Sequence, residues 1–242
     1  MKPSKGFTLI EMLVTMTLLS AIIMVGSSAF ALFSQRWDRQ LDEFDDTLRY
    51  ARDLAIVQRV LTSLIPYVVF SEDREPLIYF EGNRNGFVTV ASQSAYVEST
   101  YVVARFSVVQ DDNLRYQVLY EEWAMEEEIL RSPTQNIEFN TPLVLFSGVK
   151  SPIFEYFGHD SLQTKTGVGA FGLPSSPQWM PSFNALDMGF SPEKVRLSFS
   201  TSNGYQEILS SVAEMPPGLL SRYQQDIIDD TMAENTTMLS YD

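Results

Sequence analysis

The chain opens with a short basic leader and then a long apolar stretch, joined by Lys5-Gly6-Phe7-Thr8-Leu9-Ile10-Glu11. The apolar stretch runs from Phe7 to about Phe33, and Glu11 is its only charge. At about 1.5 Å per helical residue it spans roughly 40 Å, which is enough to cross a bilayer. A carboxylate inside such a span costs on the order of 3 kcal/mol. We therefore expect a partner to neutralise Glu11, which favours assembly over catalysis.

The charges around the stretch predict its orientation. Lys2, Lys5 and the α-amino group precede it and favour a cytoplasmic N-terminus, so the rest of the chain would be exported. Arg36 and Arg39 follow the stretch and weaken this rule.

Two ordinary interpretations compete for this segment. A secretory signal would be cut at the small-residue site Ala29-Phe30-Ala31, but its apolar run is long and Glu11 sits awkwardly at its head. A plain signal anchor explains the length of the run and leaves Glu11 unexplained.

The residues from Gly6 to Glu11 resemble the class III signal of type IV pilins and of the pseudopilins of type II secretion. The resemblance implies that a prepilin peptidase cuts between Gly6 and Phe7, that Phe7 is then N-methylated, and that Glu11 is kept. The new amine of one subunit would meet Glu11 of its neighbour in a helical filament. Such an ion pair offsets the desolvation of both groups and sets the axial register.

Composition predicts a globular domain behind the span. The chain is 45% hydrophobic and 12% aromatic, and the roughly 200 residues after the span suffice for one core. Its net charge of −14 would become −16 on losing Lys2 and Lys5, which argues against nucleic acid as a partner. There is no cysteine, so no disulfide holds the exported part together.

The helix is predicted to continue beyond the membrane to Ile65, where Pro66 would stop it. Residues 34–65 contain no Gly or Pro, and apolar residues recur at helical spacing: Leu41, Phe44, Leu48, Ala51, Leu54, Val57, Leu61 and Leu64. We interpret the charges on the other faces as solvated, with contact to a neighbouring subunit's helix as the alternative.

Beyond Pro66 the pattern changes to strands, so the predicted fold class is α+β. Antiparallel hairpins are predicted over residues 77–90, 101–120 and 195–209, with further short strands at 142–146 and 153–157. Residues 158–191 read as a long loop anchored by Trp179 and Phe183, and a short helix is expected at 219–228. The predicted parts are a leader at 1–6, a transmembrane helix at 7–33, its amphipathic continuation at 34–65, a β-rich domain at 66–215 and an acidic tail at 216–242.

No catalytic or cofactor constellation is apparent, and we predict no enzyme activity. His159 is the only histidine and reads as a polar surface residue. The acidic residues around Trp123 read as a solvated, mutually repelling stretch, and whether they bind cations stays open: Glu121, Glu122, Glu126, Glu127 and Glu128. Asp111-Asp112-Asn113 is best explained as a turn.

The order of hairpins, the Trp-bearing loop and the segment Pro192-Glu193-Lys194-Val195-Arg196-Leu197 resemble the J-type minor pseudopilins of type II secretion. That resemblance implies a single-pass inner-membrane subunit with a periplasmic domain at the tip of a pseudopilus. Its partners would be other minor and major pseudopilins, the prepilin peptidase and inner-membrane lipid. The alternatives are a minor pilin of a type IV pilus and an exported binding protein with an ordinary signal peptide.

Overall fold

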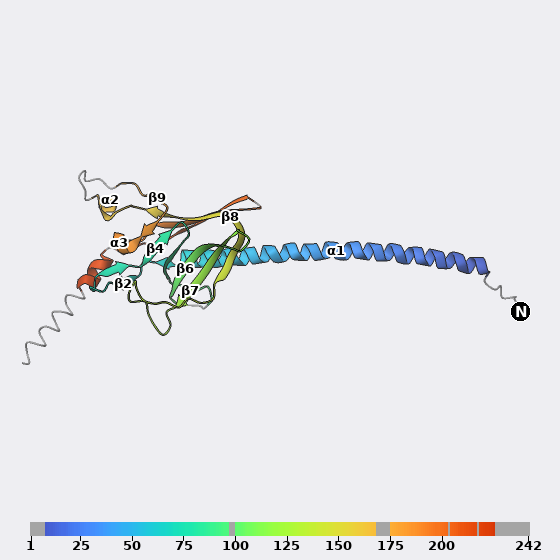
Figure 1. The fold of residues 1–242 in the computed structure, drawn as a ribbon, viewed down its shortest axis with the longest axis horizontal. Helices are drawn as coiled ribbons and strands as arrows, with labels where there is room; N and C mark the ends of the chain where they lie inside the picture. Colours follow the sequence, from blue (N-terminus) through green and yellow to red (C-terminus); the bar gives the residue numbers. More distant parts are fainter. Residues whose placement is uncertain (1–7, 97–99, 168–174, 203, 217, 226–242) are drawn as a thin grey trace, which may run out of the picture. The chain divides into compact units, whose positions relative to one another are not determined.

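The structure is a computed structural model, which describes residues 8–96, 100–167, 175–202, 204–216 and 218–225. The chain divides into two compact units, one ending at Ala51 and the other beginning at Arg52. A long helix, α1 (Leu9–Thr62), runs through the end of the first unit and into the second. Antiparallel strands follow it (Figure 1), so the predicted α+β class is confirmed.

The helix α1 ends at Thr62, and the predicted end at Ile65 is wrong. Leu64 and Ile65 instead form strand β1, which pairs with β5 (Gly86–Ala91). The backbone leaves the helix as soon as this sheet edge can satisfy its hydrogen bonds, before Pro66 is reached.

Most strands belong to one antiparallel sheet, in the order β10-β4-β5-β6-β7-β8-β11-β12, with β1 on β5 and β9 on β8. Its further strands are β4 (Phe80–Asn83), β6 (Val102–Gln110), β7 (Tyr116–Ala124), β8 (Leu143–Gly158), β9 (Gln178–Met180), β10 (Phe183–Asn184), β11 (Lys194–Thr201) and β12 (Gly204–Ser211). Strands β2 (Val68–Phe70) and β3 (Pro76–Ile78) form a separate pair.

The three predicted hairpins are confirmed as β4–β5, β6–β7 and β11–β12. The β4–β5 turn requires a glycine where it leads into β5. Gly86 has φ 149°, and a Cβ there would lie 2.0 Å from the Phe106 carbonyl oxygen. The Tyr156 hydroxyl clamps this turn by donating to the carbonyl oxygens of Asn83 and Gly86, each at 2.8 Å.

Two local predictions are corrected. The strands expected at 142–146 and 153–157 are parts of one 16-residue strand, β8. Gly148 (φ 68°) and Ser151 (φ 49°) bend it without ending it, since the pairing resumes after each irregularity.

The long loop expected at 158–191 contains regular structure in its described part. Besides β9 and β10 it holds two short helices, α2 (Leu162–Thr166) and α3 (Ala185–Met188). Phe183 is buried as the predicted anchor, while Trp179 is half-buried. Residues 219–225 are helical within the span predicted at 219–228. The rest of the predicted helix and tail, at residues 226–242, lies outside the described residues, as does residue 217.

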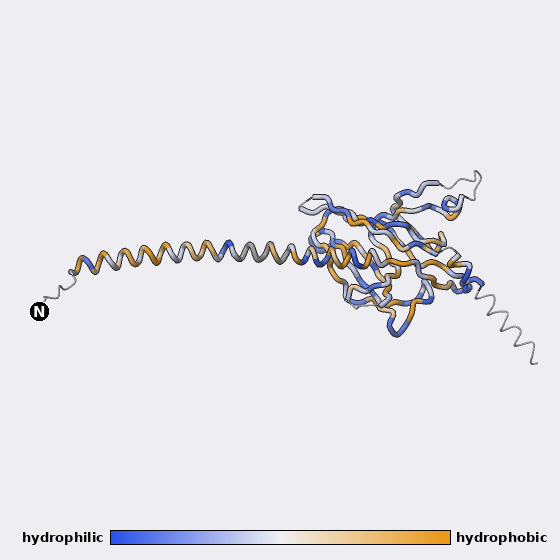
Figure 2. The backbone as a smooth tube through the Cα atoms, turned by 180° about the vertical axis from the view of Figure 1, so that it is seen from behind, coloured by the Kyte–Doolittle hydropathy of each residue, from blue (hydrophilic) through white to orange (hydrophobic). Residues whose placement is uncertain are grey.

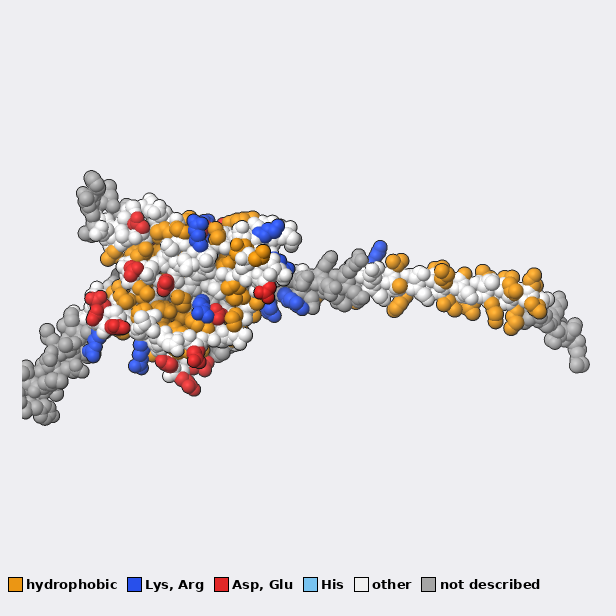
Figure 3. All heavy atoms as spheres, in the orientation of Figure 1, with side chains coloured by type: hydrophobic (Ala, Val, Ile, Leu, Met, Phe, Trp, Pro, Cys, Tyr) orange, Lys and Arg blue, Asp and Glu red, His pale blue; other side chains and the backbone are white. Residues whose placement is uncertain are grey.

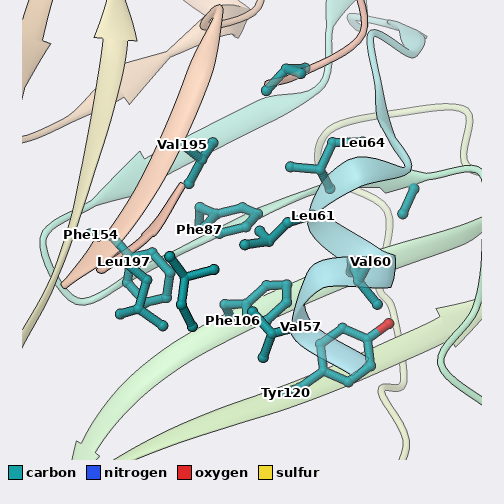
Figure 4. Packing of buried hydrophobic residues seen from close by; sticks show 14 of the residues in the cluster. Val57, Val60, Leu61, Leu64, Phe87, Phe106, Tyr120, Phe154, Val195 and Leu197 are labelled. Atoms are coloured by element: carbon teal, nitrogen blue, oxygen red, sulfur yellow. The ribbon is translucent and has the colours of Figure 1, made fainter. Parts of the chain in front are cut away.

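The core forms where the last turns of α1 meet the sheet. Val57, Val60 and Leu61 are fully buried, and Figure 4 shows them beside Phe106 and Tyr120. The predicted apolar stripe therefore divides into two parts.

The C-terminal residues of the predicted apolar stripe enter the core, whereas Phe44 and Leu48 are exposed on α1. Leu41 lies outside the described side chains.

Phe87 is the centre of the aromatic packing in this core. Its ring stacks on Phe80 and Phe106, with centroid distances of 5.6 and 5.0 Å, and meets Phe154 edge-on at 5.4 Å. Each such pair adds about 0.5–1.5 kcal/mol beyond the burial of its area. The hairpin β4–β5 is therefore joined to β6 and β8 by one ring.

Phe87→Ala should lower the free energy of unfolding by about 3–5 kcal/mol, because it removes a buried ring from between three others. The matched control is Phe44→Ala, at an exposed position on α1, which should stay within about 0.5 kcal/mol of wild type. Urea unfolding of the full chain in detergent micelles, followed by tryptophan fluorescence, measures both. Equal losses in the two variants would contradict this account of the core.

Candidate functional site

The candidate site is the start of α1, where Thr8 caps the helix. The Thr8 carbonyl oxygen accepts from the backbone N–H of Glu11 at 3.1 Å and of Met12 at 3.2 Å. The Thr8 hydroxyl oxygen also accepts from the Glu11 N–H, at 3.3 Å. Thr8 and Glu11 thus stand in the Thr-x-x-Glu spacing of a capping box. This spacing is visible in the sequence and could have predicted the cap, but it was not among the predictions above.

Glu11 consequently has a local role in the first turn of its own helix. A carboxylate there is stabilised by the helix dipole by about 0.3–1 kcal/mol. That gain is smaller than the cost of placing a charge inside a membrane span, which reaches about 3 kcal/mol at the centre of the span. Helix capping alone therefore does not account for Glu11, and a cation from outside the helix is still required.

No such cation pairs with the Glu11 carboxylate among the described residues. The predicted processing residues Gly6 and Phe7 lie outside the described residues, so the cleavage and methylation remain predictions. The position of Glu11 in the first turn fits the ion pair expected of it, because its carboxylate stands at the end of the helix where the new amine would be created.

The apolar helix behind Glu11 has no cover from the described chain. The segment Leu9–Trp37 has 29 residues, none of them buried, and its length and composition suffice to cross a membrane. A signal sequence would meet the same criteria. Figure 2 shows the hydrophobic residues along this part of α1 by their colour, and Figure 3 shows hydrophobic side chains on its surface. Such a surface requires lipid or other helices around it.

Four hydroxyl groups of this segment form hydrogen bonds within the helix. The hydroxyls of Thr15, Thr17, Ser20 and Ser28 donate to backbone carbonyl oxygens three or four residues earlier, at 2.8–2.9 Å. The bilayer core contains no water that could form these hydrogen bonds instead. These hydroxyl groups are thus compatible with lipid, whereas the Glu11 carboxylate needs a partner there.

Residues 1–27 match the family model of the prokaryotic N-terminal methylation motif. The chain carries a type IV pilin-like prepilin signal. This signal is the one found in type IV pilin-like proteins, both pilins and pseudopilins. The match covers the leader and the first part of α1 and none of the β domain. No curated protein matches the chain.

The acidic stretch around Trp123 is solvated only in part, so that prediction is corrected. Glu126, Glu127 and Glu128 are exposed as expected. Glu121 is buried and forms a two-pronged ion pair with Arg105, at 2.7 and 2.8 Å. The pairing of β6 with β7 places these two residues opposite each other, which sequence spacing alone did not indicate.

Glu122 is also buried, and its carboxylate holds a distant segment against β7. It accepts from the Tyr120 hydroxyl at 2.5 Å, from the Ala95 N–H at 2.9 Å and from the Ser94 hydroxyl. Burial of the ring and then the adjacent Glu122 raise the pKa of Tyr120 well above its ordinary value. Three donors on a buried carboxylate form a structural network that fixes residues 94–95.

The other polar candidates have structural explanations. Asp111 Oδ1 accepts from the N–H groups of Asn113 and Arg115, at 2.9 and 2.8 Å, which confirms the predicted turn. These backbone bonds, chiefly the one from Arg115, lower the pKa of Asp111. Within the described ranges, no group of three or more His, Cys, Asp or Glu residues could hold a metal ion.

His159 is not the surface residue that was predicted. Its side chain is 11% exposed, its Nδ1 is buried without a hydrogen-bond partner, and its Nε2 lies 3.7 Å from the Glu193 carboxylate. The end of β8 is covered by the segment before β11, whose Glu193 N–H donates to the Phe157 carbonyl oxygen at 2.8 Å. This contact between β8 and a segment distant in the sequence buries the His159 ring.

The buried tyrosines predict how stability depends on alkaline pH. Burial raises the pKa of Tyr120 and Tyr156, whereas in the unfolded chain both ionise near pH 10. The folded state then holds more protons than the unfolded state, so stability should fall as the pH rises above 10. Tyr156→Phe should make this fall shallower, as measured by urea unfolding between about pH 9 and 11.5.

The matched control is Tyr205→Phe, at an exposed position on β12, which should keep the wild-type dependence on pH. A Tyr156→Phe variant with the wild-type slope would contradict the role assigned to burial.

Proposed function

We propose that this chain is a minor subunit at the tip of a type II secretion pseudopilus, of the J type, where it helps to initiate assembly. The methylation motif at residues 1–27 carries the proposal. It lies directly before an exposed apolar helix that keeps one acidic residue, Glu11, in its first turn. The sequence resemblance of the β domain to J-type minor pseudopilins supports the finer assignment.

In this proposal a prepilin peptidase removes residues 1–6 and frees a cationic amine at Phe7. The amine then becomes methylated and remains basic. When the subunit enters the assembly, Glu11 pairs with the amine of a neighbour, and the pair offsets a desolvation cost of several kcal/mol per ion. Insertion at any other axial position leaves both charges without a partner. The pairing therefore selects the register as well as the assembled state.

The proposed location is the bacterial inner membrane, with the N-terminus in the cytoplasm and residues 66–215 in the periplasm. Lys2 and Lys5 support this orientation. The proposed partners are other minor and major pseudopilins. The methylation motif is equally compatible with a minor pilin of a type IV pilus, and the genes adjacent to this one, secretion genes or pilus-retraction genes, would distinguish the two.

Glu11→Gln keeps the shape of the side chain and removes its charge. We expect cleavage after Gly6 to proceed as in wild type, and recovery of the subunit with its partner subunits to fall at least about tenfold, which corresponds to about 1.4 kcal/mol. Immunoblotting measures the size shift on cleavage, and co-purification after crosslinking in the native host measures assembly.

Glu72→Gln is the matched control, because Glu72 is exposed between β2 and β3 and the variant makes the same change of charge. It should assemble normally. Normal co-purification and normal secretion by Glu11→Gln would sink the proposed role of Glu11.

A further inference from the structure

An aromatic patch occupies one face of α1 at the C-terminal end of the apolar segment. Phe30, Phe33 and Trp37 follow one another at spacings of three and four residues, which places them on the same face. Their side chains are 71%, 61% and 54% exposed. Phe33 and Trp37 stack with ring centroids 5.8 Å apart and planes at 27°. Together with Ser34 the three rings line a hollow of about 200 Å³.

We propose that Trp37 and the adjacent Arg36 form an interfacial anchor in the phospholipid headgroup region at the C-terminal end of the membrane span, with Phe33 and Phe30 continuing the patch into the hydrocarbon. The proposal rests on the membrane-anchored part of the proposed function and is independent of any role at a filament tip. Its partner is lipid, recognised by the Trp37 ring at the level of the glycerol esters, by the phenyl rings on the acyl chains and by a guanidinium on the phosphates.

The length of the helix supports this placement. Glu11 and Trp37 are 26 residues apart, or about 39 Å along a helix. A bilayer is about 40–45 Å thick with its headgroup regions and about 30 Å without them. If the span is centred between Glu11 and Trp37, the hydrocarbon core takes about twenty residues, from about Val14 to Ser34. Glu11 and Trp37 then lie in opposite interfacial regions.

The chemistry of the patch fits that depth. Tryptophan is enriched at membrane interfaces, where its ring is apolar and its indole N–H can meet a polar group. Arg36 is exposed on the turn beside Trp37. Arg36 lies two residues beyond the boundary of the hydrocarbon core at Ser34, so its long flexible stem can turn outward and bring the guanidinium to the phosphates. Arginine binds phosphate oxygens through two parallel N–H groups.

A neighbouring helix is the competing occupant, and the residue types favour lipid. Helices that associate in a membrane approach closely through small residues. This patch presents three bulky rings, whereas small residues lie just before and among them, at Gly26, Ser27, Ser28, Ala29 and Ala31. A close helix contact is therefore better served by residues 26–31 than by the aromatic face.

Tryptophan fluorescence of the full chain in phospholipid vesicles tests the anchor. The vesicles contain no other subunit, and their lipids carry bromine either near the glycerol end or near the methyl end of one acyl chain. Only the tryptophan emission that lipid bromine can reach is quenched. We expect bromine near the glycerol end to quench this part at least about twofold more strongly than bromine near the methyl end, since Trp37 should lie at the interface. The quenchable part should vanish in Trp37→Phe, because Trp123 and Trp179 are in the β domain.

Stronger quenching by the methyl-end bromine would overturn the proposal, since Trp37 would then lie deep in hydrocarbon. Equal emission with and without either label would also overturn it, because Trp37 would then lie in water or against another helix. Assembly has no part in this measurement. A failure of Glu11→Gln to affect assembly, with interfacial quenching retained, would remove the tip proposal and leave the anchor.

Discussion

The apolar surface of Leu9–Trp37 must be covered by something other than the described part of this chain, and the rest of the account depends on that constraint. Apolar area left in water costs about 25 cal/mol for each Å², and here an entire helical segment is exposed. The same helix ends with Val57, Val60 and Leu61 fully buried beneath the sheet. One continuous α1 therefore joins a segment that needs an external apolar environment to a domain that supplies its own core.

Glu11 makes that external environment specific. Lipid alone would cover the apolar side chains, but it supplies no cation for the Glu11 carboxylate. A charge costs about 3 kcal/mol at the centre of a span, so drawing Glu11 into the hydrocarbon would cost more than the about 0.3–1 kcal/mol gained at the helix N-terminus. The remaining cost of the charge is best offset by a cation at the same depth. The chain carries the prokaryotic methylation motif, and the amine that the proposed cleavage before Phe7 would expose would have the right charge to supply it. The proposed assembly thus follows from an imbalance of charge that processing corrects.

The features that could be predicted from the sequence are those determined by residues close together along the chain. The hairpins were predictable because their turns carry local signals, such as Asp111, whose carboxylate organises the turn before Arg115. The continuity of β8 was not, because Gly148 and Ser151 resemble breaks unless the partner strands are known.

The burial of Glu122 was missed for a similar reason, since its donors on Ser94 and Ala95 are 28 and 27 residues away. Of the candidate site, the motif and Glu11 could be predicted from the chain, while the proposed partner of Glu11 belongs to another subunit.

The mass of the mature chain tests the central claim most directly. The full-length chain would be expressed with a prepilin peptidase and, in parallel, without it, and the membrane-bound product would be analysed by intact-mass and N-terminal peptide mass spectrometry. The account predicts a chain that begins with N-methyl-Phe7 and retains Glu11 when the peptidase is present, and an unprocessed chain when it is absent. A product that begins at Leu32, after cleavage behind Ala31, would contradict the account, because it would lack both Glu11 and most of the apolar helix.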